Sequence, residues 1–426
     1  MHGAVAPVFV IEPRLWRRVR AVPRAWLAAN LRAVAQRYDG HLTLRVGDPV
    51  DVLPALARDL GAQRIHLTRE TSPWGVHRDR RVAHALREVG VEGVATGSPY
   101  AVTPGQLLTG QGTPYQVFTP WSKAWLEHGW PAPAVEPHEA ELVHADSDRD
   151  ADGLLSEAIA ATAAELPEPG EDAALVRWRS FLDGSLDVYD EGRDRPALDA
   201  TSRMSAYLKV GAVHPRTLLA DLAGRDDEGA RRFRLELGWR EFYADVLHHR
   251  PESAWSDLRP ALSGLEYDEP GPEFDAWCEG RTGFPVVDAG MRQLLAEGWM
   301  HNRVRMITAS FLTKDLHVWW PHGARHFLAH LADADIASNN HGWQWVAGTG
   351  TDASPYFRVF NPITQGLKFD PEGEYVRRWV PELADFPGRA AHEPWKHGGA
   401  PGYPGPIVDH AEERTEALRR YDAARH

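Results

Sequence analysis

A five-residue segment near the middle of the chain concentrates hydroxyl groups ahead of a helical pattern. Thr201, Ser202, Arg203, Met204 and Ser205 precede apolar residues at helical spacing. Hydroxyls and backbone N–H groups at the start of a helix can receive a diphosphate. The same residue types are also common helix N-caps, and the segment taken alone favours that structural role.

A second polar group lies further along the chain. Asp333 and Asp335 flank an alanine, and Asn339 and Asn340 follow closely. These acceptors could hold ribose hydroxyls or the edge of a flavin ring. Turn and capping roles are the structural alternative.

Tryptophan is abundant, and the 17 copies lie mainly beyond residue 175. An indole ring can stack on a base or relay an electron, although core packing is the usual role of each tryptophan taken singly. The candidates for a chemical role are Trp239, Trp299, Trp320, Trp343 and Trp345.

Two further motifs match known patterns only in part. Residues 348–353 fit G-x-G-x-x-A by letter, but neither a strand nor a βαβ unit surrounds them, so we reject a dinucleotide site there. His326 and His330 lie one helical turn apart without a third ligand. We therefore expect no metal site.

Composition restricts the class of protein and its partners. A chain of 426 residues exceeds what one hydrophobic core usually supports, which predicts two domains. It has no apolar run near the roughly 20 residues that cross a bilayer, a single cysteine and no signal peptide, so we expect a cytoplasmic protein without a membrane partner. Because the net charge is −13, any DNA surface must be a local basic patch.

The first part of the chain alternates short apolar runs with helical patterns. The runs are Val8–Ile11, Leu42–Arg45, Ile65–Thr68 and Val91–Ala95. This alternation predicts a doubly wound parallel sheet, and we assign residues 1–130 to an α/β domain.

The remainder of the chain changes character. Residues 131–172 are rich in Pro, Glu and Ala and are interpreted as an inter-domain connection. From residue 173 to 426 apolar residues recur at three- and four-residue spacing, for example over 231–247 and 302–318. We therefore predict an all-α second domain.

Taken together, these motifs resemble the photolyase and cryptochrome family over nearly the whole chain, and most closely the class I cyclobutane pyrimidine dimer photolyases. The match rests on long strings in the family's order and approximate spacing. They are residues 110–115, 117–120, 239–243, 282–289, 299–303, 339–345 and 360–362.

The resemblance implies a U-shaped FAD, active in its reduced form FADH⁻, in the helical domain. On this basis the diphosphate and flavin roles replace the capping roles favoured above. The implied contacts are Tyr189, Thr201, Ser202, Arg203, Met204, Ser205, Arg240, Arg305, Asp333, Asp335 and Asn339. Asn339 matches the position that faces flavin N5, and an amide has no titratable proton to give to a reduced anionic ring.

The resemblance also implies a substrate and a reaction. The positions that line the dimer pocket are Glu236, Trp239, Asn302, Met306 and Trp345. The related (6-4) enzymes have histidines at the positions of Asn302 and Met306, so their acid chemistry is missing here. The implied activity is light-driven electron transfer to a flipped-out pyrimidine dimer in damaged DNA. Arg193, Arg303 and Arg358 are the implied phosphate contacts, with ordinary ion pairing as the alternative.

The electron relay departs from the family at its outer end. Trp343 and Trp320 match the inner and middle tryptophans, whereas Tyr267 stands at the usual outer position. A tyrosine is oxidised only with loss of its proton and is a poorer terminal donor. Another aromatic such as Trp319 is the alternative.

The N-terminal domain departs further. The family's opening strand is absent ahead of Val5, which we interpret as a misassigned start or a truncation. We expect its loss to leave two inner strand edges unpaired and the antenna pocket incomplete. Residues 72–79 favour 8-hydroxy-5-deazaflavin as antenna over methenyltetrahydrofolate, with no antenna as a further alternative. We expect a monomer, and a cryptochrome-like signalling role is the main rival function.

Overall fold

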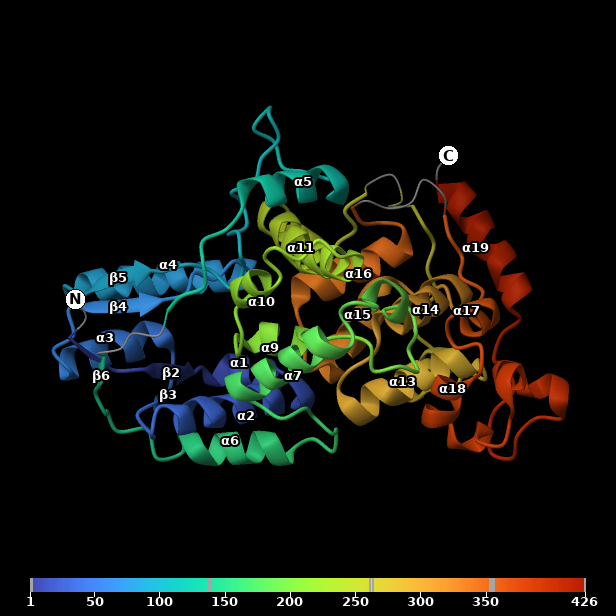
Figure 1. Ribbon diagram of the computed structural model, residues 1–426, viewed down its shortest axis with the longest axis horizontal. Coiled ribbons are helices and arrows are strands. Elements are labelled where there is room, and N and C mark those ends of the chain that lie inside the picture. The colour runs from blue at the N-terminus through green and yellow to red at the C-terminus, as the bar shows by residue number, and fades with distance from the viewer. Residues whose placement is uncertain (1–2, 136–139, 260–261, 263, 352–356, 425–426) are drawn as a thin grey trace.

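The computed structural model describes residues 3–135, 140–259, 262, 264–351 and 357–424. Its N-terminal α/β part and its helical part lie at opposite ends of the long axis (Figure 1). Residues 352 and 353, which complete the G-x-G-x-x-A string, lie outside the described residues.

The four predicted strands are present, each within one residue of its expected bounds. Strand β2 (Val8–Ile11) pairs in parallel with β3 (Thr43–Val46), and β4 (Arg64–Leu67) pairs in parallel with β5 (Glu92–Ala95). A short parallel pair, β1 (Ala4–Val5) with β6 (Glu141–Leu142), accompanies them. Parallel pairing requires crossover helices, as the alternating pattern predicted.

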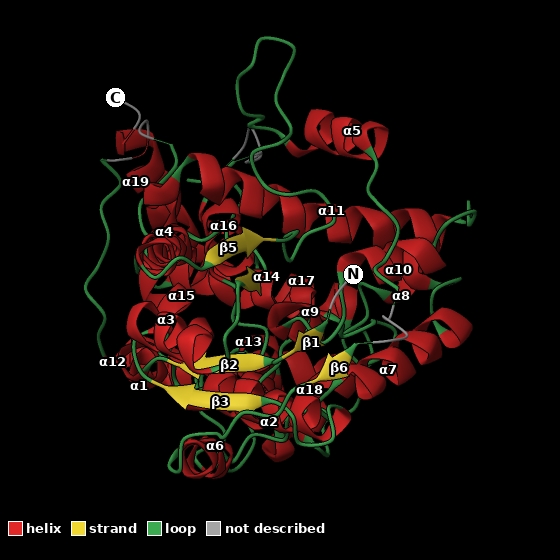
Figure 2. Cartoon of the chain, turned by 90° about the vertical axis from the view of Figure 1, so that its left-hand side faces the viewer, coloured by secondary structure: helices red, strands yellow, loops and turns green. Residues whose placement is uncertain are grey.

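The parallel strands do not form one continuous sheet. Among the described strands, β2–β3 and β4–β5 are separate two-stranded ladders, and no strand bridges β2 and β4. Figure 2 shows β5 well above the β2–β3 pair. The two inner edges are therefore unpaired in the described part of the chain, as expected without a middle strand.

Helices surround these strands and continue into the predicted connection. They are α1 (Pro13–Arg18), α2 (Ala21–Arg37), α3 (Pro49–Asp59), α4 (Pro73–Glu88), α5 (Phe118–His128) and α6 (Ala151–Ala160). Leu155 of α6 is buried in one cluster with Ile11 and Leu31. A helix of the 131–172 segment thus packs onto the α/β part, while the limits of 130 and 172 stay a prediction.

The C-terminal part is helical throughout its regular elements. These are α7 (Glu171–Gly184), α8 (Tyr189–Gly192), α9 (Ser205–Val210), α10 (Pro215–Asp221), α11 (Glu228–His249), η1 (Pro251–Ala254), α12 (Pro272–Glu279), α13 (Pro285–Glu297), α14 (Asn302–Ser310), η3 (Phe311–Asp315), α15 (Trp320–His330), α16 (Ile336–Ala347), α17 (Pro362–Phe369), α18 (Glu374–Trp379), η4 (Pro381–Leu383), η5 (Gly388–His392), η6 (Pro394–His397) and α19 (His410–Ala424).

One predicted helix is shorter than expected. The apolar periodicity predicted a single helix over 302–318, but α14 ends at Ser310 and passes into the π-helical turn η3. His317 then adopts φ 52°, a left-handed conformation that ends the helical path. Periodicity does not distinguish a π-turn from an α-turn, since both keep apolar residues on the buried side.

A buried carboxylate joins the two parts. Glu241 of α11 accepts hydrogen bonds from the backbone N–H groups of Ala101 and of Val102 (3.0 Å) and from Trp125 Nε1 (2.7 Å). Burial raises the pKa of Glu241 although these three donors oppose the shift. Helix α11 is thereby fixed to the loop that follows the α/β strands. Among the described residues, no helix is both long and apolar enough to span a membrane.

Candidate functional site

Three neighbouring helices present the predicted flavin and substrate contacts. Helix α16 packs against both α11 and α14. Because residues four apart share one face of a helix, Asn302 with Met306 and Asn339 with Trp343 form pairs on single faces. The predicted residues on these helices are Glu236, Trp239 and Arg240 on α11, Asn302, Arg305 and Met306 on α14, and Asn339, Trp343 and Trp345 on α16.

Asp333 and Asp335 are held in different ways just before α16. Arg305 donates two hydrogen bonds to Asp333, at 2.9 and 3.2 Å. Asp335 caps α16 by accepting the N–H of Ser338 at 2.8 Å. Burial opposes ionisation of Asp335, but Lys209 and Arg240 outweigh it and lower its pKa. The predicted capping alternative is thus present at Asp335, which also remains a charged acceptor beside the site.

The Asn339 amide has a defined orientation. Its Nδ2 donates to the carbonyl of Ala324 (3.1 Å) and to Asn340 Oδ1 (2.8 Å). Because a backbone carbonyl can only accept, the amide nitrogen must face Ala324. The carbonyl Oδ1 is therefore the group of Asn339 that is left for a ligand with an N–H to donate.

Arg177 holds the 201–205 loop from outside. Its guanidinium donates to the carbonyls of Thr201 (2.6 Å) and Ser202 (3.1 Å). The hydroxyl of Ser202 accepts the N–H of Met204 at 3.3 Å. Sequence reasoning missed Arg177 because it lies 24 residues before Thr201 and belongs to no motif.

Arg203 adopts φ 55°, a conformation that is uncommon for a residue with a side chain and that clusters at functional sites. Its guanidinium stacks over Trp299 at 4.1 Å and pairs with Glu297 at 3.3 Å. A cavity of about 310 Å³ lies on this side of the loop, between Arg177, Arg203 and Trp299. The Arg203 side chain is thus already held by Trp299 and Glu297 beside that cavity. The backbone of the 201–205 loop is therefore the part of this segment that is left for a cofactor.

Tyr189 and Arg240 are packed against aromatic neighbours. Tyr189 is buried and meets the ring of Phe181 edge to face, with a centroid distance of 5.4 Å. Arg240 stacks over Tyr100 at 4.4 Å and donates to the carbonyl of Pro99 at 3.0 Å. Arg240 therefore connects α11 to the loop after the α/β strands.

Glu236 and Arg193, predicted for the dimer and for phosphate, form an ion pair with one another at 2.6 Å. Arg303 pairs likewise with Asp194, also at 2.6 Å. Arg303 Nη1 lies 3.7 Å from the sulfur of Met306. The ion-pairing alternative is thus realised for both arginines, and a phosphate that binds either one would compete with a carboxylate.

Trp239 is fixed by stacking. Its ring lies 3.7 Å from that of Phe118 with 11° between the planes. Phe118 begins α5, so a helix that follows the α/β strands supports this ring. Trp239 is only half-buried, which leaves aromatic surface for a further ring.

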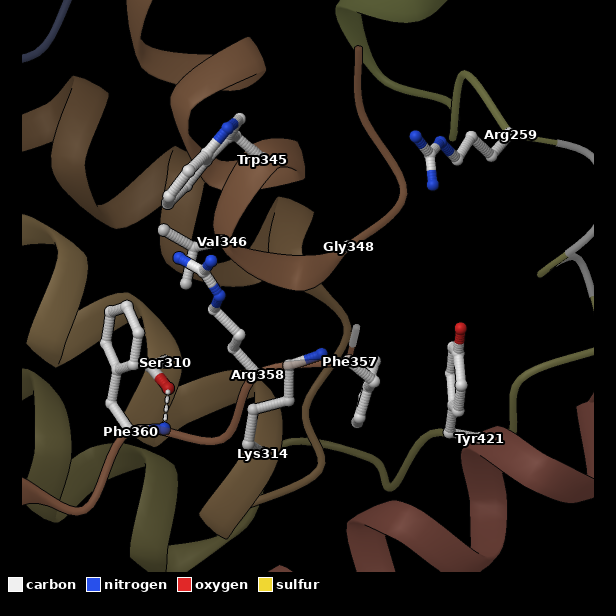
Figure 3. Close-up of a pocket in the computed structure, with 10 residues that line it drawn as sticks. All are labelled: Arg259, Ser310, Lys314, Trp345, Val346, Gly348, Phe357, Arg358, Phe360 and Tyr421. Carbon is white, nitrogen blue, oxygen red and sulfur yellow. Dashed lines mark hydrogen bonds between the residues drawn. The ribbon is translucent and has the colours of Figure 1, made fainter. Parts of the chain in front are cut away.

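Arg358 and Trp345 line a small cavity of about 30 Å³ (Figure 3). Lys314 of η3 lies in its floor, where Nζ donates to the carbonyl of Ala347 at 2.6 Å and sits 3.3 Å from the Phe357 ring. Burial lowers the pKa of Lys314 well below its ordinary value. Lys314 thus ties η3 to the end of the helix that carries Trp345, a role that no sequence motif indicated.

The relay aromatics lie in the helical core and at its edge. Trp343 is buried and meets Phe327 (5.0 Å) and Trp277 (6.0 Å). Trp320 is fully buried and meets Trp319 at 6.4 Å, and Trp319 meets Tyr267 at 6.3 Å. Trp319 therefore lies between Trp320 and Tyr267. A ring contact between Trp343 and Trp320 is not among those of the described residues.

The residues present fit a flavin. The indole Nε1 of Trp343 is buried without a hydrogen-bond partner among the described residues. Asn339 Oδ1 and the Asp335 carboxylate supply hydrogen-bond acceptors at the start of α16, the helix that also carries Trp343. A polar ring with both donors and acceptors satisfies such groups, whereas an apolar ligand would leave them unpaired. In the described residues, no group of three or more His, Cys, Asp or Glu gathers around a metal position.

Comparison with known proteins places both parts of the chain in one family. Residues 1–139 match a family model described as DNA photolyase, and residues 233–423 match the FAD binding domain of DNA photolyase. The chain is 43% identical to the deoxyribodipyrimidine photo-lyase of Escherichia coli, covering 99% of this chain and 93% of that protein. It is 39% identical to that of Halobacterium salinarum, covering 100% and 92%.

Solved structures give the same result. A bacterial class III photolyase from Agrobacterium tumefaciens superposes with a TM-score of 0.90 at 38% identity, covering 99% of this chain and 92% of that chain. A cryptochrome from Synechocystis superposes with a TM-score of 0.87 at 25% identity, covering 98% and 93%. Both parts of the chain match this family, and the chain belongs to the DNA photolyase family.

Proposed function

We propose that this protein uses light to split cyclobutane pyrimidine dimers in DNA. The observation that carries the proposal is the arrangement of an acid, an amide, a thioether and two indoles on α11, α14 and α16 in a chain about 40% identical to deoxyribodipyrimidine photo-lyases. Asn302 and Met306 at positions where (6-4) enzymes have histidines favour the cyclobutane dimer as substrate. The assignment to class I stays a prediction, since one superposed structure is a class III enzyme.

FAD would be held by the 201–205 backbone, Arg305 with Asp333, and Asp335 with Asn339. Bound and reduced, it would supply the electron that light transfers to the dimer and that returns after the ring opens. Asn339 Oδ1, the free acceptor of that amide, suits the N5–H of a reduced flavin. An amide has no titratable proton to transfer, so it would preserve the anionic reduced ring.

DNA would bind by exchanging carboxylates for phosphates. Arg193 and Arg303 leave Glu236 and Asp194 when a phosphate takes their place, because charge-assisted pairs with phosphate satisfy the same guanidinium groups. Arg358, which is exposed, adds a third cation. Release of Arg193 frees Glu236 to accept hydrogen bonds from the dimer edge. Trp239 and Trp345 hold the flipped bases by stacking.

Electron supply to the flavin would follow Trp343 and Trp320, and Tyr267 stands where the resemblance places the outer member. The Trp319 ring contacts both Trp320 and Tyr267, and these contacts support Trp319 as an alternative member of the relay. For the antenna, residues 72–79 favour 8-hydroxy-5-deazaflavin over methenyltetrahydrofolate. An archaeal photolyase from Sulfolobus tokodaii, 29% identical, is described with two FAD molecules, so FAD joins the candidates. We further propose that the protein acts as a monomer.

The test is blue-light repair of an oligonucleotide with one defined thymine dimer by photoreduced protein, compared with a dark control. Glu236→Ala is expected to lower the repair yield at least about tenfold, the equivalent of one charge-assisted hydrogen bond in the transition state, and DNA affinity less than threefold. Glu228→Gln on the exposed start of the same helix is the matched control and is expected to repair normally. Equal repair by Glu236→Ala would remove Glu236 from the mechanism. Absence of light-dependent repair despite bound, reduced FAD would favour a cryptochrome-like role.

A further inference from the structure

We propose that Asp257 is the proton acceptor for Trp320 when that tryptophan is oxidised in the electron relay. The inference rests on the proposed function, since it concerns how electrons reach the flavin. Asp257 lies between η1 and the segment that leads to Tyr267, and Trp320 begins α15. Neither a motif nor the family resemblance singled out Asp257.

The pair is joined by a short hydrogen bond in a protected place. Trp320 Nε1 donates to Asp257 Oδ1 at 2.6 Å. The Trp320 ring is fully buried, while Asp257 is half-buried and keeps access to water. A carboxylate at this distance stabilises a positive charge on the indole strongly because the surroundings screen it weakly. The same hydrogen bond provides a path for the indole proton.

Tyr267 has no comparable arrangement. Its hydroxyl is buried without a hydrogen-bond partner among the described residues, and the same holds for Nε1 of Trp319. Burial, and then the charge of Asp257, raise the pKa of Tyr267. Oxidation of a phenol requires release of its proton. Trp320 has a proton acceptor in Asp257, and Tyr267 has none among the described residues. The oxidising equivalent therefore comes to rest at Trp320, one step inside the predicted terminal donor.

With bound FAD as the light-driven electron acceptor, Trp343 would supply one electron, and one electron from Trp320 would refill Trp343. The Trp320 radical cation then loses its Nε1 proton to Asp257, which leaves a neutral indolyl radical beside a neutral carboxylic acid. An external one-electron donor such as a thiol reduces the radical, and Asp257 returns the proton. Charge separation persists because the neutral radical no longer attracts the electron on the flavin.

The test is flash-induced transient absorption of the FAD-loaded, oxidised protein, which distinguishes the tryptophan radical cation, the neutral tryptophan radical and the tyrosyl radical. The wild type is expected to form a long-lived neutral tryptophan radical. Asp257→Asn keeps the shape and the acceptor but cannot take a proton, so the cation is expected to persist and to recombine at least about tenfold faster, the equivalent of one charge-assisted hydrogen bond. Trp320→Phe is expected to abolish the long-lived signal, and Tyr267→Phe to leave it unchanged.

Three results would overturn the proposal: an unchanged radical and lifetime in Asp257→Asn, a tyrosyl radical in the wild type, or loss of the long-lived signal in Tyr267→Phe. Should Asp257→Asn bind no FAD, the wild type in heavy water decides, because proton transfer to Asp257 predicts slower conversion of cation to neutral radical, and an unchanged rate contradicts it. Dimer repair by chemically reduced protein bypasses the relay and is expected to be normal in Asp257→Asn. Failure of repair in the wild type would refute the proposed function while leaving the radical result interpretable.

Discussion

The helical site and the parallel strands of the α/β part differ in how completely their hydrogen bonds and packing are formed. Most backbone hydrogen bonds of α11, α14 and α16 form within each helix, and α16 packs on both α11 and α14. Strands β2–β3 and β4–β5 form separate ladders, each with an inner edge that has no partner among the described strands. A helix forms its backbone hydrogen bonds internally, whereas a strand needs a neighbouring strand for its own. The helices that carry the proposed flavin and dimer contacts therefore pack together in a chain whose strand layer is divided.

The largest expected effect breaks the connection between the two parts. Glu241→Ala leaves the N–H groups of Ala101 and Val102 and Trp125 Nε1 without an acceptor. Buried unpaired donors cost about 1–3 kcal/mol each, so we expect the free energy of unfolding to fall by roughly 3 kcal/mol or more. Urea denaturation followed by circular dichroism measures the loss. Glu241→Gln, which keeps the shape and one acceptor oxygen, is the control and is expected to lose less; an equal loss in both variants would mean that the remaining acceptor contributes nothing.

A second change disturbs only the helical core. A methyl group at Gly323 of α15 would overlap the Trp343 ring, so Gly323→Ala is expected to cost about 1–3 kcal/mol and to displace that ring. At Gly342 of α16 nothing lies within 4 Å of the added carbon, and Gly342→Ala is expected to be neutral or stabilising by up to about 1 kcal/mol. Thermal unfolding of the two variants measures the difference. Similar melting temperatures would show that the core near Trp343 adapts freely.

Lowering the pH tests how much the charge of Asp335, at the start of α16, stabilises the helical part. The pKa of Asp335 is lowered in the folded protein, so its charge stabilises the fold above the ordinary carboxyl pKa of about 4, and this stability is lost as the pH falls through the lower folded value. Asp335→Asn removes this titration but keeps a capping side chain, so at neutral pH the variant loses mainly the stability that the charge supplies. Unfolding free energies from pH 7 downward are expected to decline less in the variant below about pH 4. Parallel curves would contradict the assignment.

The smallest effect is expected on the divided strands. Arg64 of β4 and Glu92 of β5 form an exposed cross-strand pair at 2.7 Å. Exposed pairs contribute little, so Glu92→Gln is expected to change stability by less than about 0.5 kcal/mol in urea denaturation. A loss of more than about 1 kcal/mol in the free energy of unfolding would mean that this exposed pair contributes more to the ladder than exposed ion pairs usually do.

Features that depend on local sequence patterns were predictable, and features that depend on contacts across the fold were not. Strand positions and the helix bearing Glu236 and Trp239 were predictable because periodicity and motif strings are local. The π-turn at 311–315, the pairing of Glu236 with Arg193 and the roles of Arg177 and Lys314 were not. Each depends on which side chains meet across the fold, and no spacing along the chain reports that. Asp257 illustrates the same limit, since its partner Trp320 is 63 residues away.

We expect the residues on α11, α14 and α16 to carry out repair without an antenna chromophore. The most direct measurement is recovery of intact thymines from a thymine-dimer oligonucleotide under blue light, by protein that contains chemically reduced FAD and no second chromophore. The account predicts recovery in the light, none in the dark, and an action spectrum that follows reduced FAD. Binding of the dimer without recovery in the light, by protein that retains reduced FAD, would contradict it.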